Sequence, residues 1–152
     1  MRKRESDEFQ AAFWAAKRAM AGATEAAFNR HGVRAGQQFI LQTLWDEDCL
    51  TPGEVARRLG LATPTVTKAA TRMEATGLLA RKPHPTDARL VRLCLTDRGW
   101  SLRRAIDDEI RRLSERALRT LDTAERADAV RLLVEIRQNL TGAERRARAA
   151  GS

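Results

Sequence analysis

The sequence predicts a mainly α-helical protein with a small β-hairpin, an α+β fold. Three observations support this prediction. Apolar residues recur every three or four positions near both ends of the 152-residue chain, which is the pattern of amphipathic helices. Two short helices with their own start and stop signals lie between Thr51 and Gly77. Two short strand-like segments then follow, separated by a loop that contains two prolines.

Composition limits the partners and the location of the chain. The 28 Lys and Arg residues against 20 Asp and Glu residues give a net charge of +8, which favours nucleic acid or an anionic membrane surface as partner. The sequence contains no run of about 18 apolar residues, the length needed to span a membrane. Its first residues are not followed by the apolar core of a signal peptide. We therefore expect a folded protein of the cytoplasm with no membrane partner.

The outer helices are predicted from their apolar stripes. The first should run from Phe9 to about Arg30, and a shorter one should follow from Gln37 to Asp46. Toward the other end of the chain a stripe from Leu102 to Leu121 covers about five turns, and a final helix should start at Asp122 or Thr123.

These long terminal helices raise a problem of burial. A central module of 46 residues is too small to cover the apolar stripes of all of them within one chain. A second copy of the chain could cover them, so we expect a homodimer formed through the terminal helices. The alternative is an intramolecular helical bundle in which every stripe is covered internally.

The two central helices have the spacing of a helix-turn-helix. Thr51, Pro52 and Glu54 are the residues of a capping box with a proline in the first turn, and Gly60 is a natural stop. Thr63 and Pro64 repeat the cap and the proline, so a second helix should begin only four residues after the first one ends.

The second central helix has two different faces. Its inner face carries four apolar residues, namely Val66, Ala69, Ala70 and Met73. Its outer face is slim, carries hydroxyl and cationic groups, and is formed by Pro64, Thr65, Thr67, Lys68, Thr71, Arg72 and Ala75. A DNA major groove favours such a surface, although an ordinary solvated helix face is built from similar residues.

The hairpin segment strengthens the DNA-binding interpretation. LLARK and LVRLCLT have strand propensity, and PHPTDAR between them suits a loop. From Arg57 to Arg92 eight cationic residues stand against only Glu74 and Asp87, which is a net charge of +6 in about a quarter of the chain. A concentrated positive charge beside a helix that fits a groove is typical of a protein that binds double-stranded DNA.

In this order, EVARRLGLATPTVTKAATRMEATGLLAR and the pattern Asp87, Ala88, Arg89 followed by LTDRG resemble the multiple antibiotic resistance regulator (MarR) family of bacterial transcription factors. The resemblance covers nearly the whole chain. It implies a single domain over residues 1–152, with dimerisation helices at 1–32 and 100–150 and a winged helix-turn-helix lobe at 36–99. The recognition helix would run from Thr63 to about Thr76. The implied function is that of a ligand-responsive homodimeric repressor that binds a pseudo-palindromic operator and is associated with the nucleoid when bound.

The resemblance also implies roles in the wing. Asp87 would brace Arg89, whose guanidinium would enter the minor groove. The family often has a further arginine where this chain has Ala88 or Leu90, so we expect a weaker hold on that groove. The phosphate contacts that could offset this loss are those of Arg81, Lys82 and Arg92.

A small aromatic or phenolic effector is a further implication of the resemblance. The elements that would line its pocket carry Trp14, Arg18, Gln38, Gln42 and Trp45. Each of these residues also has a plain structural interpretation, with the tryptophans in the core and the arginine on the surface.

The sequence carries no pattern of an enzyme, a metal site or a cofactor site, because it has no glycine-rich phosphate loop, ligand cluster or matched nucleophile. Cys49 and Cys94 stand far apart, and we expect two separate buried or half-buried thiols. Two alternatives to a ligand-responsive regulator remain open. One is a cysteine-based redox-sensing regulator, and the other is an architectural DNA-binding protein without strong sequence preference.

Overall fold

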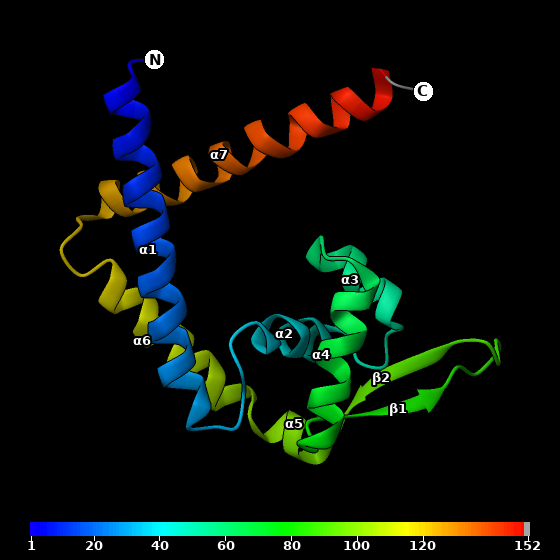
Figure 1. Ribbon diagram of the computed structural model, residues 1–152. Helices are drawn as coiled ribbons and strands as arrows, with labels where there is room; N and C mark the ends of the chain where they lie inside the picture. The colour runs from blue at the N-terminus through cyan, green and yellow to red at the C-terminus, as the bar shows by residue number, and fades with distance from the viewer. Residues whose placement is uncertain (151–152) are drawn as a thin grey trace. The chain divides into compact units, whose positions relative to one another are not determined.

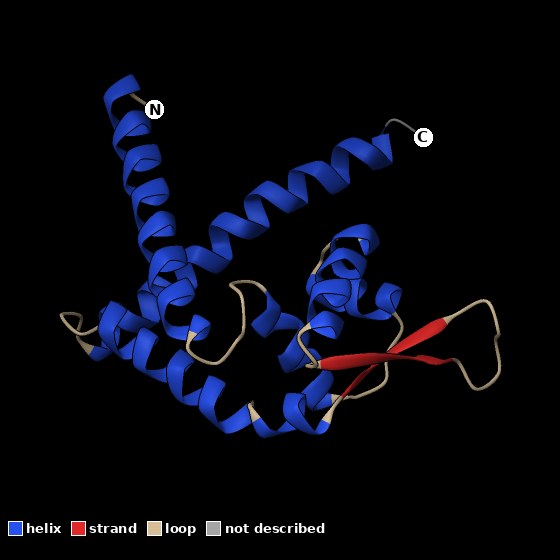
Figure 2. Ribbon diagram, turned by 60° about the horizontal axis from the view of Figure 1, so that its bottom comes forward, coloured by secondary structure: helices blue, strands red, loops and turns tan. Residues whose placement is uncertain are grey.

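The computed structural model describes the backbone of residues 1–150 and the side chains of residues 1–142 (Figure 1). The chain forms two compact units, Met1–Leu113 and Ser114–Ser152. The elements are α1 (Lys3–Asn29), α2 (Gln37–Asp46), α3 (Pro52–Leu59), α4 (Thr63–Ala75), β1 (Leu79–Pro83), β2 (Val91–Leu95), α5 (Asp97–Ser101), α6 (Arg103–Ala117) and α7 (Thr123–Ala150). Helices dominate, with one two-stranded hairpin (Figure 2), so the predicted fold class is confirmed. None of the described helices is both long and apolar enough to cross a membrane.

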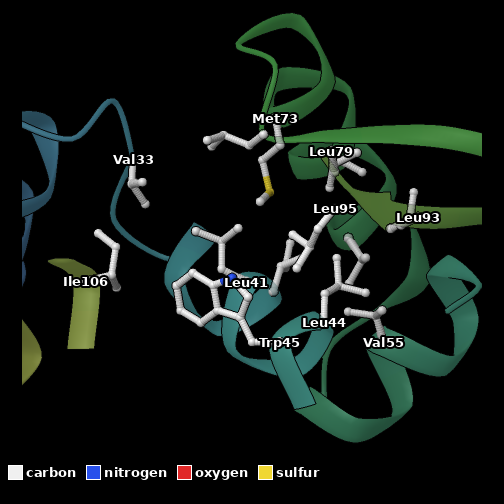
Figure 3. Packing of buried hydrophobic residues seen from close by; sticks show 14 of the residues in the cluster. Val33, Leu41, Leu44, Trp45, Val55, Met73, Leu79, Leu93, Leu95 and Ile106 are labelled. Carbon is white, nitrogen blue, oxygen red and sulfur yellow. The ribbon is translucent and has the colours of Figure 1, made fainter. Parts of the chain in front are cut away.

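The core of the first unit is organised around α2, which packs against α3, α4 and β2. Leu41, Leu44 and Trp45 of α2 are buried there (Figure 3). The other elements contribute Val55 from α3, Met73 from α4, Leu79 from β1, and Leu93 and Leu95 from β2. A fully buried side chain of this size stabilises the fold by about 1.5–3 kcal/mol. The shared core therefore fixes the position of α4 and the hairpin relative to each other.

The capping box predicted at the start of α3 is confirmed. The Glu54 amide donates to Thr51 Oγ1 at 3.2 Å, and the Thr51 amide donates to Glu54 Oε2 at 2.8 Å. These bonds, first of all the one from the Thr51 backbone, hold the pKa of Glu54 below its ordinary value. Gly60 ends the helix with φ at +66°, a conformation that glycine adopts without strain.

The predicted cap of α4 was wrong by one residue. The N-cap is Ala62, which makes no side-chain cap bond, and Thr63 is the first helical residue. Pro64 consequently occupies the second helical position, where its missing N–H still breaks no bond within the helix. The inner face of α4 is as predicted, because Val66, Ala70 and Met73 are fully buried.

Two helix predictions at the ends of the chain need correction. α1 begins at Lys3 rather than Phe9, because charged residues extend it with pairs such as Arg4–Glu8 at 2.9 Å and without an apolar signal. The stripe expected from Leu102 to Leu121 belongs to α6, which ends at Ala117, and the short helix α5 precedes it. α7 starts at Thr123 as predicted, where Asp122 and Glu125 accept hydrogen bonds from each other's amides.

The hairpin is antiparallel, and its base is tied to the loop between α2 and α3. Leu79 pairs with Leu95 and Lys82 pairs with Arg92. On the other edge of β2, the Leu93 amide donates to the Leu50 carbonyl at 2.7 Å and the Leu95 amide donates to Asp48 Oδ1 at 2.8 Å. The loop from Asp48 to Leu50 therefore continues the sheet beyond β2.

The same junction holds a disulfide between Cys49 and Cys94, which corrects the expectation of two separate thiols. The two Cα atoms lie 4.1 Å apart although 45 positions separate them in the sequence. Such spacing gave no local signal of pairing. The contact arises because the bridge between Leu50 and Leu93 brings the loop alongside β2.

Gly99 in α5 lies against Leu78, which precedes β1, at a distance that only glycine permits. A Cβ atom at this position would lie 2.2 Å from the Leu78 carbonyl oxygen. The carbonyl of Gly99 accepts a 3.0 Å hydrogen bond from the buried Trp45 indole. This residue therefore joins α5 both to the segment before β1 and to α2.

We predict that Gly99→Ala lowers the free energy of unfolding by about 1–3 kcal/mol, because the added methyl group must displace backbone. Urea unfolding followed by circular dichroism measures the change. Gly53→Ala is the matched control: a Cβ atom there meets nothing within 4 Å, so stability should be unchanged or slightly raised. Equal stability of Gly99→Ala and the native chain would contradict the prediction.

Candidate nucleic-acid interface

The outer face of α4 is exposed along its whole length. Pro64, Thr65, Thr67, Lys68, Thr71 and Arg72 all lie on it and are exposed. Leu61 and Ala62 precede the helix and are exposed as well, so its N-terminal end is accessible. The only acidic residue of the helix, Glu74, is held by a residue of β1. The exposed face is therefore slim and offers hydroxyls and cations with no free carboxylate.

The threonine hydroxyls on this face are already partly engaged. Thr67 Oγ1 donates to the Thr63 carbonyl at 3.1 Å, and Thr71 Oγ1 donates to the Thr67 carbonyl at 3.1 Å. Bonds of this kind are common for threonine within helices, and they leave each oxygen two lone pairs that can accept further bonds.

Arg81 of β1 lies over the recognition helix and not in solvent. Its NH1 donates to Glu74 Oε1 at 3.0 Å, and its backbone amide donates to Glu74 Oε2 at 2.9 Å. Its NH2 donates to Thr71 Oγ1 at 2.8 Å and to the Thr67 carbonyl at 3.3 Å. The sequence analysis did not identify Glu74 as a partner. An acid near the end of a helix, shortly before a strand arginine, is the only signal that could have suggested it.

Lys82, which follows Arg81 in β1, is exposed and cationic. Lys82 lies directly opposite Arg92 of β2, and like charges in this arrangement repel each other. Within the described chain no carboxylate forms an ion pair with either residue, and the buried Arg92 Nε has no hydrogen-bond partner. An anion bound beside this pair would relieve the repulsion.

The tip of the hairpin presents a braced arginine. Arg89 Nε and NH2 each donate to the Asp87 carboxylate at 3.1 Å, and the Arg89 amide donates to Asp87 Oδ1 at 3.0 Å. The Arg89 side chain nevertheless remains 89% exposed. The bonds from Arg89, the side-chain ones first, hold the pKa of Asp87 below its ordinary value, and Asp87 raises that of Arg89. The pair is therefore ionised and oriented over a wide pH range.

His84 shapes the loop behind this pair, a role that the sequence analysis did not assign to it. Its Nδ1 accepts hydrogen bonds from the backbone amides of Thr86 at 3.3 Å and Asp87 at 3.1 Å. The ring therefore holds the backbone from which the Asp87 side chain projects.

The residues expected around an effector differ in how far they are buried. Trp14 and Arg18 are exposed on α1, and the Trp14 indole donates to Gln10 Oε1 at 2.9 Å. Gln38 is buried and accepts from the Gly36 amide, Gln42 is half-buried, and Trp45 is in the core.

A different cavity, of about 760 Å³, lies between the end of α1, the start of α2 and the inner side of α4. Its lining combines two cationic side chains, one carboxylate and several apolar side chains, and includes Glu25, Arg34, Phe39, Ile40, Leu61, Val66 and Arg72. A volume of this size suits a small molecule, and two guanidinium groups suit an anionic one. In the described part of the chain no cluster of three or more His, Cys, Asp or Glu residues could hold a metal ion.

Helix, turn, recognition helix and braced hairpin together define a winged helix-turn-helix protein. Residues 34–91 match the MarR family. The chain is 33% identical over 96 residues to the HTH-type transcriptional regulator TtmR of Methylorubrum extorquens, an alignment that covers 63% of this chain and 49% of the relative. The chain thus spans about half the length of that curated relative.

Solved structures extend the likeness over most of the chain. Disulfide-formed AbfR is 25% identical with a TM-score of 0.70 and covers 93% of each chain. Reduced AbfR bound to DNA has a TM-score of 0.76 at 24% identity, over 91% of this chain and 94% of that one. The PcaV regulator of Streptomyces coelicolor, solved with its natural ligand, is 26% identical with a TM-score of 0.69, over 80% of this chain and 89% of PcaV. The chain thus resembles MarR-family regulators in sequence over residues 34–91 and in fold over most of its length.

Proposed function

We propose that the chain is a sequence-specific, double-stranded DNA-binding transcriptional regulator that acts as a homodimeric repressor in the bacterial cytoplasm. The observation that carries the proposal is the pairing of an exposed recognition helix, whose single acid Glu74 is bound by Arg81, with the braced and exposed Arg89 of the wing. The helix has the width and chemistry for a major groove, and an oriented guanidinium suits the narrow minor groove beside it.

The remaining cations have the positions of phosphate contacts. Lys68 and Arg72 lie on the exposed side of α4, and Lys82 and Arg92 form the like-charged pair of the hairpin. Each phosphate that such a group neutralises releases condensed counterions, which favours binding at moderate salt. AbfR, which has the same fold, was solved bound to DNA.

Exposed apolar side chains on the terminal helices support the homodimer. Phe9, Trp14 and Met20 of α1 are each nearly half exposed. On α7 the exposed apolar residues are Val130, Leu132, Leu133, Val134 and Leu140. Side chains of this kind rarely stay in water in such numbers, and a second copy of the chain would cover them.

The effector that we propose is a small aromatic or phenolic anion. The cavity beside α4 supports this class, because Arg34 and Arg72 can bind an anion while Phe39 and Leu61 contact a ring. A ligand there would contact the inner side of the recognition helix and could change its position. PcaV, a structural relative, was solved in complex with its natural ligand.

The homodimer gives the first prediction for DNA binding. Recognition helices related by a two-fold axis and about 34 Å apart should protect two half-sites about 10 bp apart between centres. DNase footprinting on an operator selected from random duplexes would measure this spacing. Protection of a single half-site by one chain would contradict the homodimer.

Competition with random DNA separates this proposal from an architectural protein. At physiological salt a specific regulator should prefer its operator by roughly 10³ or more. A coating protein would show almost no preference.

A second prediction tests the wing. Arg89→Ala should weaken operator binding by about 1–3 kcal/mol, the contribution of one good groove contact. Asp87→Ala should weaken it too, because an arginine that is no longer oriented must be ordered on binding. The two losses should be less than additive in the double variant. Fluorescence anisotropy at matched salt measures all three.

Charge counting alone predicts the opposite sign for Asp87→Ala, since removing an acid should favour a polyanion. Tighter binding by this variant, with unchanged thermal stability, would leave Asp87 as an ordinary loop acid.

A redox-sensing regulator is the second candidate, and the Cys49–Cys94 disulfide favours it. A hydroperoxide could oxidise the half-exposed Cys49 thiol to a sulfenic acid and release an alcohol. Attack by the Cys94 thiol would then form the disulfide and release water. Because the bond joins the base of the wing to the loop before α3, its reduction should loosen the wing.

We predict that a thiol reductant weakens operator binding roughly fivefold or more, at the lower end of typical coupling between sites. Anisotropy titrations with and without reductant measure the effect. Cys49→Ser and Cys94→Ser should bind like the reduced chain in both conditions. An affinity that reductant does not change would make the disulfide purely structural.

A further inference from the structure

Every polar contact that the structure gives the Arg81 side chain is to the recognition helix. The guanidinium bonds to the Glu74 carboxylate at 3.0 Å, to the Thr71 hydroxyl at 2.8 Å and to the Thr67 carbonyl at 3.3 Å. Only 26% of the side chain is exposed. Its neighbour Lys82 is exposed and has no ion pair within the described residues. Two adjacent cations of one strand are therefore used in different ways.

A phosphate would have to compete with these contacts. To reach one, Arg81 would exchange charge-assisted bonds for others of similar strength, and would leave the Glu74 carboxylate facing the DNA backbone. Net attraction to DNA gains little from such an exchange. Arg81 is therefore better placed to hold the helix than to bind phosphate.

The contact with Thr71 determines what that residue can present to DNA. A hydroxyl has one donor hydrogen, and Thr71 uses it on the Thr67 carbonyl. The oxygen accepts a strong bond from the Arg81 guanidinium as well. Neither bond is available to a base edge without breaking a contact within the protein. What remains is one acceptor lone pair of the oxygen and the Thr71 methyl group, so Thr71 can donate no hydrogen bond to a base.

We propose that Arg81 and Glu74 are a positioning pair that fixes the hairpin to the recognition helix and occupies the Thr71 hydroxyl. Thr71 then reads DNA through its methyl group, by apolar contact with the 5-methyl group of thymine. This inference rests on the proposed function. It adds a specificity-determining role for Thr71 and gives Arg81 a role other than the expected phosphate contact.

The ionisation of the pair agrees with this geometry. The pKa of Glu74 is lowered, first by the hydrogen bond from the Arg81 backbone amide and then by the bonds and charge of its side chain. The carboxylate therefore stays charged well below neutral pH, and the positioning pair is intact at any pH at which DNA binding is measured.

The first arm of the test compares two substitutions of Thr71 on the duplex that the native chain selects from a random pool. Thr71→Val keeps the methyl group and removes the hydroxyl, so the preference for thymine at the contacted position should stay within about twofold. Thr71→Ser keeps the hydroxyl and removes the methyl group, so the preference should fall about fourfold, the effect of one buried methyl group.

The reverse pattern would show that the hydroxyl reads the base and would overturn the proposal. It would also be overturned if neither substitution changed the preference. If the native chain selects no sequence at all, the proposed function itself fails, and the base-reading role of Thr71 fails with it.

The second arm removes the pair without changing the net charge. In the double variant Glu74→Gln with Arg81→Gln, the salt dependence of operator affinity should stay unchanged while the preference over random DNA falls severalfold. Lys82→Gln is the matched control from the same strand. It should lower the slope of log affinity against log salt by about one, with little change in preference.

A slope lowered by about one in the double variant would show that Arg81 contacts phosphate and would overturn the proposal. Arg81→Lys supplies a milder variant should the double variant unfold. A lysine keeps the charge but lacks the planar guanidinium group that donates to Glu74 and Thr71 together. The preference of this variant for the operator over random DNA should therefore also fall. An Arg81→Lys variant that keeps the native preference for the operator over random DNA would contradict the role of the guanidinium group.

Discussion

Burial of the apolar face of α2 is the constraint on which the rest of the recognition lobe depends. Leu41, Leu44 and Trp45 are fixed between α3, α4 and β2, so the helix-turn-helix and the hairpin share one core. Neither element has enough apolar surface to fold alone. Because the core takes the inner face of α4 completely, the outer face is left to threonine and lysine side chains. The DNA-facing chemistry of the helix is thus a consequence of how its other side is packed.

The acidic residues of the basic segment show how its charge is controlled. Between residues 57 and 92 only Glu74 and Asp87 are acidic, and each binds an arginine of the hairpin. Neither carboxylate is therefore free to repel a phosphate. One pair faces the helix and is partly buried, whereas the other leaves Arg89 projecting from the tip. The same residue types thus serve two purposes, and solvent exposure of the arginine distinguishes them.

The parts of the fold that could be predicted were those with local signals. The bounds of α2, the capping box at Thr51 and the glycine stop at Gly60 depend on neighbouring residues alone, and they were found. The start of α1, the short helix α5 and the Cys49–Cys94 bond were missed. Long-range packing or charged helix formers decide these features, and no periodic pattern marks them. In the candidate site, the outer face of α4 followed from the sequence pattern and the Asp87–Arg89 contact from the family resemblance, but the engagement of Arg81 depends on where β1 passes over the helix. The groove contacts of these residues stay predictions.

The base of the wing suggests how large a redox response can be. Three consecutive residues bind β2: Asp48 through its carboxylate, Cys49 through the disulfide and Leu50 through its carbonyl. Reduction removes the middle contact only, so the two hydrogen bonds still hold the strand in register. Thr51, which caps α3, follows directly, and any added motion of this loop reaches the helix-turn-helix as well as the wing. A reduced chain should therefore keep its fold and lose part of the preorganisation of both DNA-facing elements. Under the proposed redox role, reduction would therefore lower the affinity for DNA by a moderate factor and would not abolish binding.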